Sequence, residues 1–257
     1  MAQRTISERV FESYLLQNGV ECAQILEGTQ KEPDYKVIVG SEVLIAEVKE
    51  FDHPKVFPVG GHDPLPHIRH KIDNARKQFN NYRDLSCGLI LYNERSILVH
   101  LDPTLILCAL FGEYYERDSL NTYRLSGRAK LRADCNTTIS AVVALLPLLI
   151  HADTLWAARR VWALTAEGPH KLTEEESGDV TREAYKHLGA PEVVIRAAVV
   201  ENPYARKPLS PCFFTGPFDE HWARREDGSF GILRQGPRIE ELRQICPEYL
   251  LRMIGIW

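Results

Sequence analysis

Residues 31–51 constrain the fold more than any other part of the chain. They contain two β-prone runs, Tyr35–Val39 and Glu42–Val48, separated only by Gly40 and Ser41. A two-residue loop with glycine at its first position is typical of a tight β-hairpin. The sequence therefore predicts an antiparallel hairpin in which Val39 faces Glu42.

In this register Asp34 faces Glu47 on one side of the hairpin. Lys49 emerges on the same side as Glu47, because side chains alternate along a strand. Two like charges about 5 Å apart are destabilising, and a divalent cation with oxygen ligands would neutralise them. Two carboxylates and an ammonium at the end of an apolar hairpin indicate metal-assisted phosphodiester hydrolysis.

The alternative is a solvent-exposed hairpin end, with Lys49 serving only as a salt-bridge partner. Both faces of the two strands are apolar, however, with Val37 and Leu44 on one face and Ile38 and Val43 on the other. This pattern predicts a central, covered hairpin, in which two facing acids without a partner would be costly. It therefore favours the catalytic interpretation.

The hairpin is expected within an α/β (α+β layered) core with a mixed central sheet. A helix with Ser7 as its N-cap and Gly19 at its end opens the chain. The other elements expected in this half are a strand at Glu21–Glu27, the hairpin, a helix at 67–84, and strands at Gly88–Tyr92 and Ile97–Leu101.

The second half is expected to form a C-terminal elaboration, residues 103–257, packed on a core of residues 1–102 as one compact unit. The helices expected there are Pro103–Phe111, Ala152–Ala166, Glu174–Leu188 and Arg238–Cys246, and the strands are Thr138–Leu146 and Val193–Val200, with a further element beginning at Phe218–Trp222.

Composition sets limits on the class of protein. The chain has 257 residues, of which 44% are hydrophobic, and a net charge of −4, so any nucleic-acid binding would use a local basic surface. The most apolar run, residues 139–150, is too short to span a bilayer. Six scattered cysteines and an N-terminus without a signal-peptide core predict a cytoplasmic protein with reduced thiols and no membrane association.

Four motifs, in order, carry a resemblance to a known family. They are Glu12, Pro33-Asp34, Glu47-Val48-Lys49, and Gln78 followed four residues later by Tyr82. Together they resemble the PD-(D/E)XK nuclease superfamily, and the last resembles the Gln-x-x-x-Tyr signature of its RecB-like branch. The expected element order agrees with the restriction-endonuclease-like α-β-β-β-α-β core of that superfamily.

The resemblance implies a role for each matched residue. Asp34, Glu47 and the main-chain carbonyl of Val48 would ligate Mg²⁺ or Mn²⁺, and Glu12 would reach the metal directly or through water. Lys49 would position the attacking water or stabilise charge on the phosphate. Glu12 has an equally simple alternative as an ordinary exposed helical glutamate.

Gln78 and Tyr82 would organise the site and help to hold nucleic acid, and with Lys71 and Asn74 they form the expected nucleic-acid-binding residues. Lys71, Asn74 and Gln78 form a polar stripe beside the apolar face of the 67–84 helix. In the alternative, Tyr82 is a core residue and Gln78 is a solvated one.

Two further groups of residues suggest weaker possibilities. Basic residues in the 67–84 helix and in the segment 124–132 are compatible with a groove for the phosphate backbone or with ordinary solvated faces. Histidines 53, 62, 67 and 70 lack the zincin spacing, so a zinc hydrolase is a minor alternative.

The sequence thus predicts a metal-dependent nuclease, with DNA rather than RNA as the expected substrate. One alternative is a non-catalytic subunit that keeps the fold and binds nucleic acid or protein. Another is a hydrolase of a small phosphorylated molecule. A homodimer or a place in a larger complex is compatible with each of these.

Overall fold

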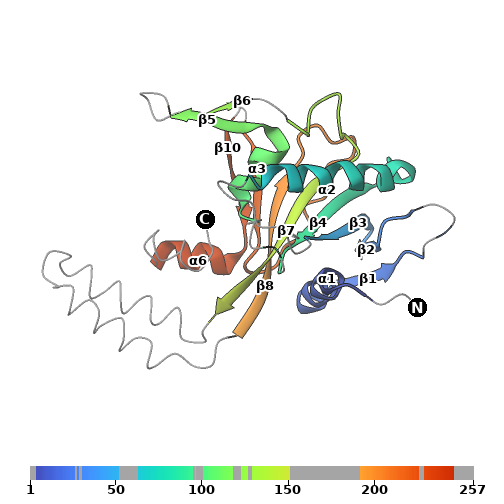
Figure 1. Ribbon diagram of the computed structural model, residues 1–257. Helices are drawn as coiled ribbons and strands as arrows, with labels where there is room; N and C mark the ends of the chain where they lie inside the picture. Colours follow the sequence, from blue (N-terminus) through green and yellow to red (C-terminus); the bar gives the residue numbers. More distant parts are fainter. Residues whose placement is uncertain are drawn as a thin grey trace, which may run out of the picture.

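The computed structural model describes residues 4–26, 28, 31–51, 63–94, 96, 101–117, 123–126, 129–150, 192–225 and 229–245. These residues form one eight-stranded sheet in the order β1-β2-β3-β4-β7-β8-β9-β10, with helices on both faces (Figure 1). The strands of this sheet are β1 (Glu21–Gln24), β2 (Tyr35–Val39), β3 (Glu42–Glu50), β4 (Ser86–Tyr92), β7 (Ala141–Ile150), β8 (Glu192–Glu201), β9 (Glu220–Arg224) and β10 (Phe230–Gln235).

The remaining described elements are four α-helices, a 3₁₀ helix and a small ribbon. They are α1 (Ile6–Gln17), α2 (Leu65–Gln78), α3 (Pro103–Phe111), α6 (Pro237–Ile245), a 3₁₀ turn at Phe79–Tyr82, and the antiparallel pair β5 (Glu113–Arg117) and β6 (Tyr123–Ser126). No helix within the described segments is long and apolar enough to cross a membrane.

The sheet is mixed, as predicted. Strands β1, β2 and β3 pair antiparallel, whereas β3 pairs with β4, and β4 with β7, in parallel. Strand β8 then pairs antiparallel with β7 and parallel with β9. The second half of the chain therefore continues the sheet of the first half across the β4–β7 pair.

Helix α1 begins two residues earlier than predicted. Its N-cap is Thr5, whose hydroxyl accepts a hydrogen bond from the Glu8 amide at 3.2 Å, while the Glu8 carboxylate accepts one from the Thr5 amide. Ser7 was the wrong choice because the residue three positions later is Val10, which cannot complete this capping box. The helix ends as predicted, with Gly19 at φ +67°.

The hairpin has the predicted register. Val39 faces Glu42, and the ladder continues to Tyr35 facing Ala46. Gly40 has φ +61°, a conformation that glycine adopts without steric cost. The prediction of the strand pairing from the residues of the turn is therefore confirmed.

The two faces of the sheet have separate cores. Leu44, Ala46 and Val48 of β3 pack towards α1, whereas Ile45 and the following Phe51 pack towards α2 and α3. Figure 1 shows α2 and α3 on one side of the sheet and α1 on the other. By alternation, Glu47 and Lys49 lie on the α2 face.

The prediction of a hairpin covered on both faces is only half right. Strand β3 is buried on both faces, but Lys36 and Ile38 of β2 are exposed. Residues of α2 pack with β3 and β4, so this helix leaves the neighbouring β2 uncovered.

Most other predicted elements occur with shifted ends. The 67–84 helix is α2 followed by the 3₁₀ turn, and the strand predicted at Glu21–Glu27 ends at Gln24. Helix α3 has the predicted bounds. The predicted helices Ala152–Ala166 and Glu174–Leu188, and nearly all of the strand Ile97–Leu101, lie outside the described residues.

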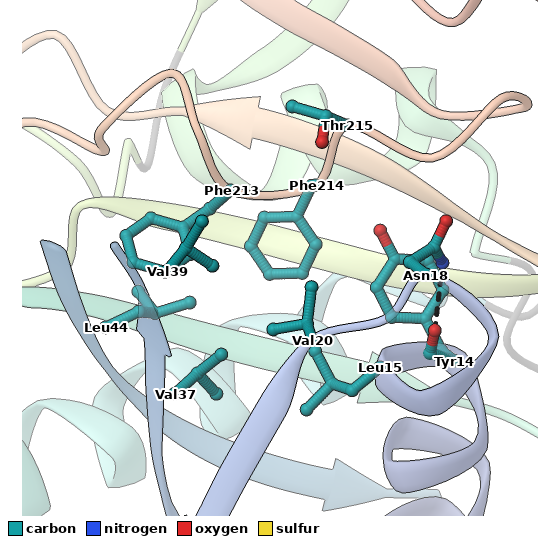
Figure 2. Close-up of a pocket in the computed structure, with 10 residues that line it drawn as sticks. All are labelled: Tyr14, Leu15, Asn18, Val20, Val37, Val39, Leu44, Phe213, Phe214 and Thr215. Atoms are coloured by element: carbon teal, nitrogen blue, oxygen red, sulfur yellow. Dashed lines mark hydrogen bonds between the residues drawn. The ribbon is translucent and has the colours of Figure 1, made fainter. Parts of the chain in front are cut away.

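The α1 face contains a small cavity of about 20 Å³, enough for about one water molecule (Figure 2). Phe213 and Phe214 lie over it from the turn before β9, and Val39 and Leu44 line it from the hairpin. The hydroxyl of Tyr14, another lining residue, already donates to Asp219 at 2.5 Å. The cavity is therefore a packing gap where α1, the hairpin and this turn meet.

Candidate active site

Asp34 is attached to β3 at two points on either side of Glu47. Its amide donates to the Ala46 carbonyl at 3.1 Å, and its carboxylate accepts a hydrogen bond from the Val48 amide at 2.7 Å. The regular ladder ends at Tyr35, and the chain bends at Asp34. The structure thus brings Asp34 alongside Glu47, as the register predicts.

Glu47 is fully buried, with 0% of its surface exposed. Among the described residues, neither carboxylate oxygen has a hydrogen-bond partner of normal geometry. The ammonium of Lys49 lies against Oε1, and its side chain is 18% exposed. A buried carboxylate normally has several donors, so Glu47 is an unusual acid in this fold.

Burial also perturbs the two groups beside Glu47. It raises the pKa of the Asp34 carboxyl, although the Val48 amide and Lys49 oppose the change. Burial lowers the pKa of Lys49 to about 8, an effect that Asp34 opposes and that Lys31 and Lys71 reinforce. Lys49 therefore exchanges its proton more readily near neutral pH than an ordinary lysine does.

The predicted ligand set fits a divalent ion in part. Two carboxylates and a main-chain carbonyl are hard oxygen donors, and Mg²⁺ needs few protein ligands because it keeps several waters. Oε2 of Glu47, which has no partner among the described residues, is available to a cation. The Val48 side chain is buried on the α1 face and its amide binds Asp34, so its carbonyl stays a predicted ligand. Within the described segments, no three His, Cys, Asp or Glu side chains converge as a metal cluster.

Glu12 is engaged elsewhere. Its carboxylate accepts hydrogen bonds from the Tyr35 hydroxyl at 2.8 Å and from Arg4 at 2.7 Å. Tyr35 packs edge-on against Phe11 in the α1-side core, opposite to the face of Glu47. The structure therefore does not place the Glu12 carboxylate with Glu47, and its metal role stays a prediction without geometric support.

Glu8, one turn before Glu12, was not predicted as a site residue. Its negative charge adds to the rise that burial causes in the pKa of Asp34 and opposes the lowering that burial causes in the pKa of Lys49, while its carboxylate completes the capping box of α1. The spacing of four residues on one helix face was the available signal.

Gln78 and Tyr82 bind the segment that leads to Asp34. The Gln78 amide donates to the Glu32 carbonyl at 3.2 Å, and the Tyr82 hydroxyl donates to the Glu32 carboxylate at 3.0 Å. Gln78 is 5% exposed and Tyr82 is partly buried. The structure thus places both residues of the Gln-x-x-x-Tyr motif next to Pro33-Asp34.

Lys71 and Asn74 lie earlier in α2 than Gln78. The Lys71 ammonium lies 5.5 Å from the centre of the Phe51 ring, and the Asn74 amide contacts the His70 ring at 2.9 Å. Lys71 is near enough to Lys49 to affect its pKa. Of the two, only Lys71 is linked to the carboxylate site by these contacts.

The other basic and histidine residues give a mixed result. Arg69 is buried and donates to main-chain carbonyls of α3, and Lys130 pairs with Asp73 at 2.6 Å. Both are structural contacts. His53 and His62 lie outside the described residues, as does Arg128. His67 and His70 remain at the start of α2.

We also compared the chain with known proteins. No family model, curated protein or solved structure matches it.

Proposed function

We propose that the protein is a metal-dependent nuclease of the PD-(D/E)XK type that hydrolyses phosphodiester bonds, with DNA rather than RNA as its substrate. The observation that carries the proposal is the state of Glu47, which is fully buried, with the Lys49 ammonium against Oε1 and no partner for Oε2 among the described residues. Such an acid is costly unless a cation accompanies it.

The surrounding groups support the same chemistry. Asp34 is fixed beside Glu47 by the Val48 amide, and Lys49 contacts Glu47. Bound Mg²⁺ or Mn²⁺ would supply Lewis acidity and a more acidic water. Asp34, Glu47 and the Val48 carbonyl would hold the ion. Lys49, with its pKa of about 8, would orient the water or stabilise charge on the phosphate.

The order of elements adds independent support. The chain runs α1, β1, β2, β3, α2, β4, which is the α-β-β-β-α-β order of the restriction-endonuclease-like core. Asp34 directly precedes β2, and Glu47 and Lys49 lie within β3. These are the elements on which the resemblance places its motif residues.

A cleavage assay tests the proposal. We expect the purified protein to cut supercoiled, linear or single-stranded DNA with Mg²⁺ or Mn²⁺ and to be inactive in EDTA. Asp34→Ala and Lys49→Met are each expected to lower the rate by about 100-fold or more. Glu241→Gln removes an exposed carboxylate that pairs with Arg238, and it serves as the matched control with normal activity.

Two outcomes would contradict the proposal. Full activity of Asp34→Ala would show that the metal site is wrong. Binding of DNA or RNA without cleavage, unaffected by either substitution, would instead favour a non-catalytic subunit. Melting curves of each variant exclude unfolding as the cause of lost activity.

A further inference from the structure

The segment before Asp34 is held by the last residue of α2 and by the 3₁₀ turn that follows it. The Gln78 side-chain amide donates to the main-chain carbonyl of Glu32, and the Tyr82 hydroxyl donates to the carboxylate of the same residue. The distances are 3.2 Å and 3.0 Å. Two donors from one helical turn thus meet at a residue two positions before Asp34.

The donors are themselves rigidly placed. Ala75 and Phe79, on either side of Gln78, are fully buried in the core between α2 and the sheet. Gln78 is 5% exposed, and Tyr82 packs against the same core. Packing therefore holds both side chains in place. Because the two donors are fixed, their hydrogen bonds restrict the position of Glu32 relative to the sheet.

The link from Glu32 to Asp34 is short and stiff. The intervening Pro33 is buried, and its ring restricts the backbone angle φ. On the other side, Asp34 is bound through its amide to Ala46 and through its carbonyl to the Ile25 amide at 2.9 Å. Because the backbone between them is restricted, a shift of Glu32 also moves Asp34.

We infer that Gln78 and Tyr82 are positioning residues, which act through Glu32 to fix the Asp34 carboxylate beside Glu47, and that neither contacts nucleic acid directly. The role of Asp34 as a ligand rests on the proposed function. The placement of Asp34 by these residues does not, and it can be measured without metal.

The enzymatic consequence differs from that of a nucleic-acid contact. Loss of a group that orients a metal ligand typically weakens metal affinity by about 10–100-fold. Tyr82→Phe is therefore expected to weaken Mn²⁺ binding, measured by calorimetry, by about tenfold. It should lower kcat at limiting Mn²⁺ and leave KM for DNA unchanged. A raised KM with unchanged Mn²⁺ affinity would overturn the inference.

A double-mutant cycle between Tyr82 and Glu32 tests the proposed route. Glu32→Ala removes the acceptor and should reproduce the effect of Tyr82→Phe, and the double variant should be no worse than either single variant. Glu32→Gln keeps an oxygen acceptor and should restore near-normal Mn²⁺ affinity. Additive effects of Tyr82→Phe and Glu32→Ala would show that Tyr82 acts elsewhere.

Hydrogen exchange separates this inference from the proposed function. In metal-free buffer, the Asp34 amide should exchange several-fold faster in Tyr82→Phe and Gln78→Leu than in the wild type. Tyr204→Phe, which alters a tyrosine that contacts Arg224, is the control and should leave this rate unchanged. Unchanged exchange in Tyr82→Phe and Gln78→Leu overturns the inference, whether or not the protein cleaves DNA. Faster exchange in a protein without nuclease activity supports the placement and refutes only the proposed function.

Discussion

Two fully buried glutamates in the same sheet have opposite surroundings. Glu220 in β9 is 0% exposed and receives hydrogen bonds from Arg196 at 2.9 Å and Arg243 at 2.7 Å. Glu47 in β3 is equally buried but has only the Lys49 ammonium against one oxygen among the described residues. The fold can therefore surround a buried carboxylate with donors, and at Glu47 the described residues supply only one.

The aspartates show the same contrast. Asp219 accepts hydrogen bonds from the Tyr14 hydroxyl and from the amides of Ala197 and Gly216, at 2.5, 2.7 and 2.6 Å. The Asp34 carboxylate accepts one among the described residues, from Val48. Glu220 and Asp219 thus have enough hydrogen-bond donors to be structural groups. Asp34 and Glu47, at the open end of the hairpin, have fewer donors and can still accept a ligand.

The largest expected effect concerns the glutamates. Glu220→Gln leaves two guanidinium groups around a neutral amide and should lower the free energy of unfolding by about 3–5 kcal/mol. Glu47→Gln should change metal-free stability by less than about 1 kcal/mol, because relief of the buried negative charge offsets the loss of the contact with Lys49. Urea denaturation in EDTA measures both. Equal decreases in the unfolding free energy of the two variants would show that Glu47 is as well paired as Glu220.

The aspartates provide a second matched pair. Asp219→Asn should lower the free energy of unfolding by about 2 kcal/mol, since an amide cannot accept from three donors as the carboxylate does. Asp34→Asn should raise it by on the order of 1 kcal/mol without metal, because burial disfavours the charge while the amide oxygen still accepts from Val48. Thermal melts in EDTA test this pair. If Asp34→Asn instead lowered the stability, the buried charge of Asp34 would not be destabilising.

The last prediction is a pH dependence of the stability due to Lys49. Its pKa is about 8 in the folded protein, below the value of about 10.5 expected in the unfolded chain. Between these values the unfolded chain binds more protons, so this group makes stability rise with pH by up to about 1.4 kcal/mol per pH unit. Lys49→Met should remove that contribution.

The difference in unfolding free energy between wild type and Lys49→Met, followed from pH 7.5 to 10, isolates the group from other titrating residues. Lys36→Met alters an exposed lysine of the same hairpin and is the control. A wild-type slope identical to that of Lys49→Met would show that Lys49 titrates as an ordinary lysine.

Local patterns predicted the hairpin well. Gly40-Ser41 determined the register, and alternation then placed Glu47 and Lys49 on one face with Asp34 beside them. These inferences succeeded because turn geometry and the two-residue period of a strand act over a few neighbouring residues.

Local patterns could not predict the contacts between segments that are distant in the sequence. The rotation of α1, which directs Glu12 to Tyr35, follows from how Phe11 and Tyr14 pack in the core. Likewise, nothing near Gln78 in the sequence indicates that its partner is Glu32, 46 residues away. The role expected for Gln78 came from a resemblance, whereas the contact depends on tertiary packing.

The parallel β4–β7 pair has a further consequence for how such a protein can diversify. Every group proposed for the chemistry lies before β4 or on α2, and the later strands join the sheet on the far side of β4. The outermost strand, β10, lies at the edge of the sheet opposite β1, so a change in length at that edge would leave the neighbours of Glu47 in place.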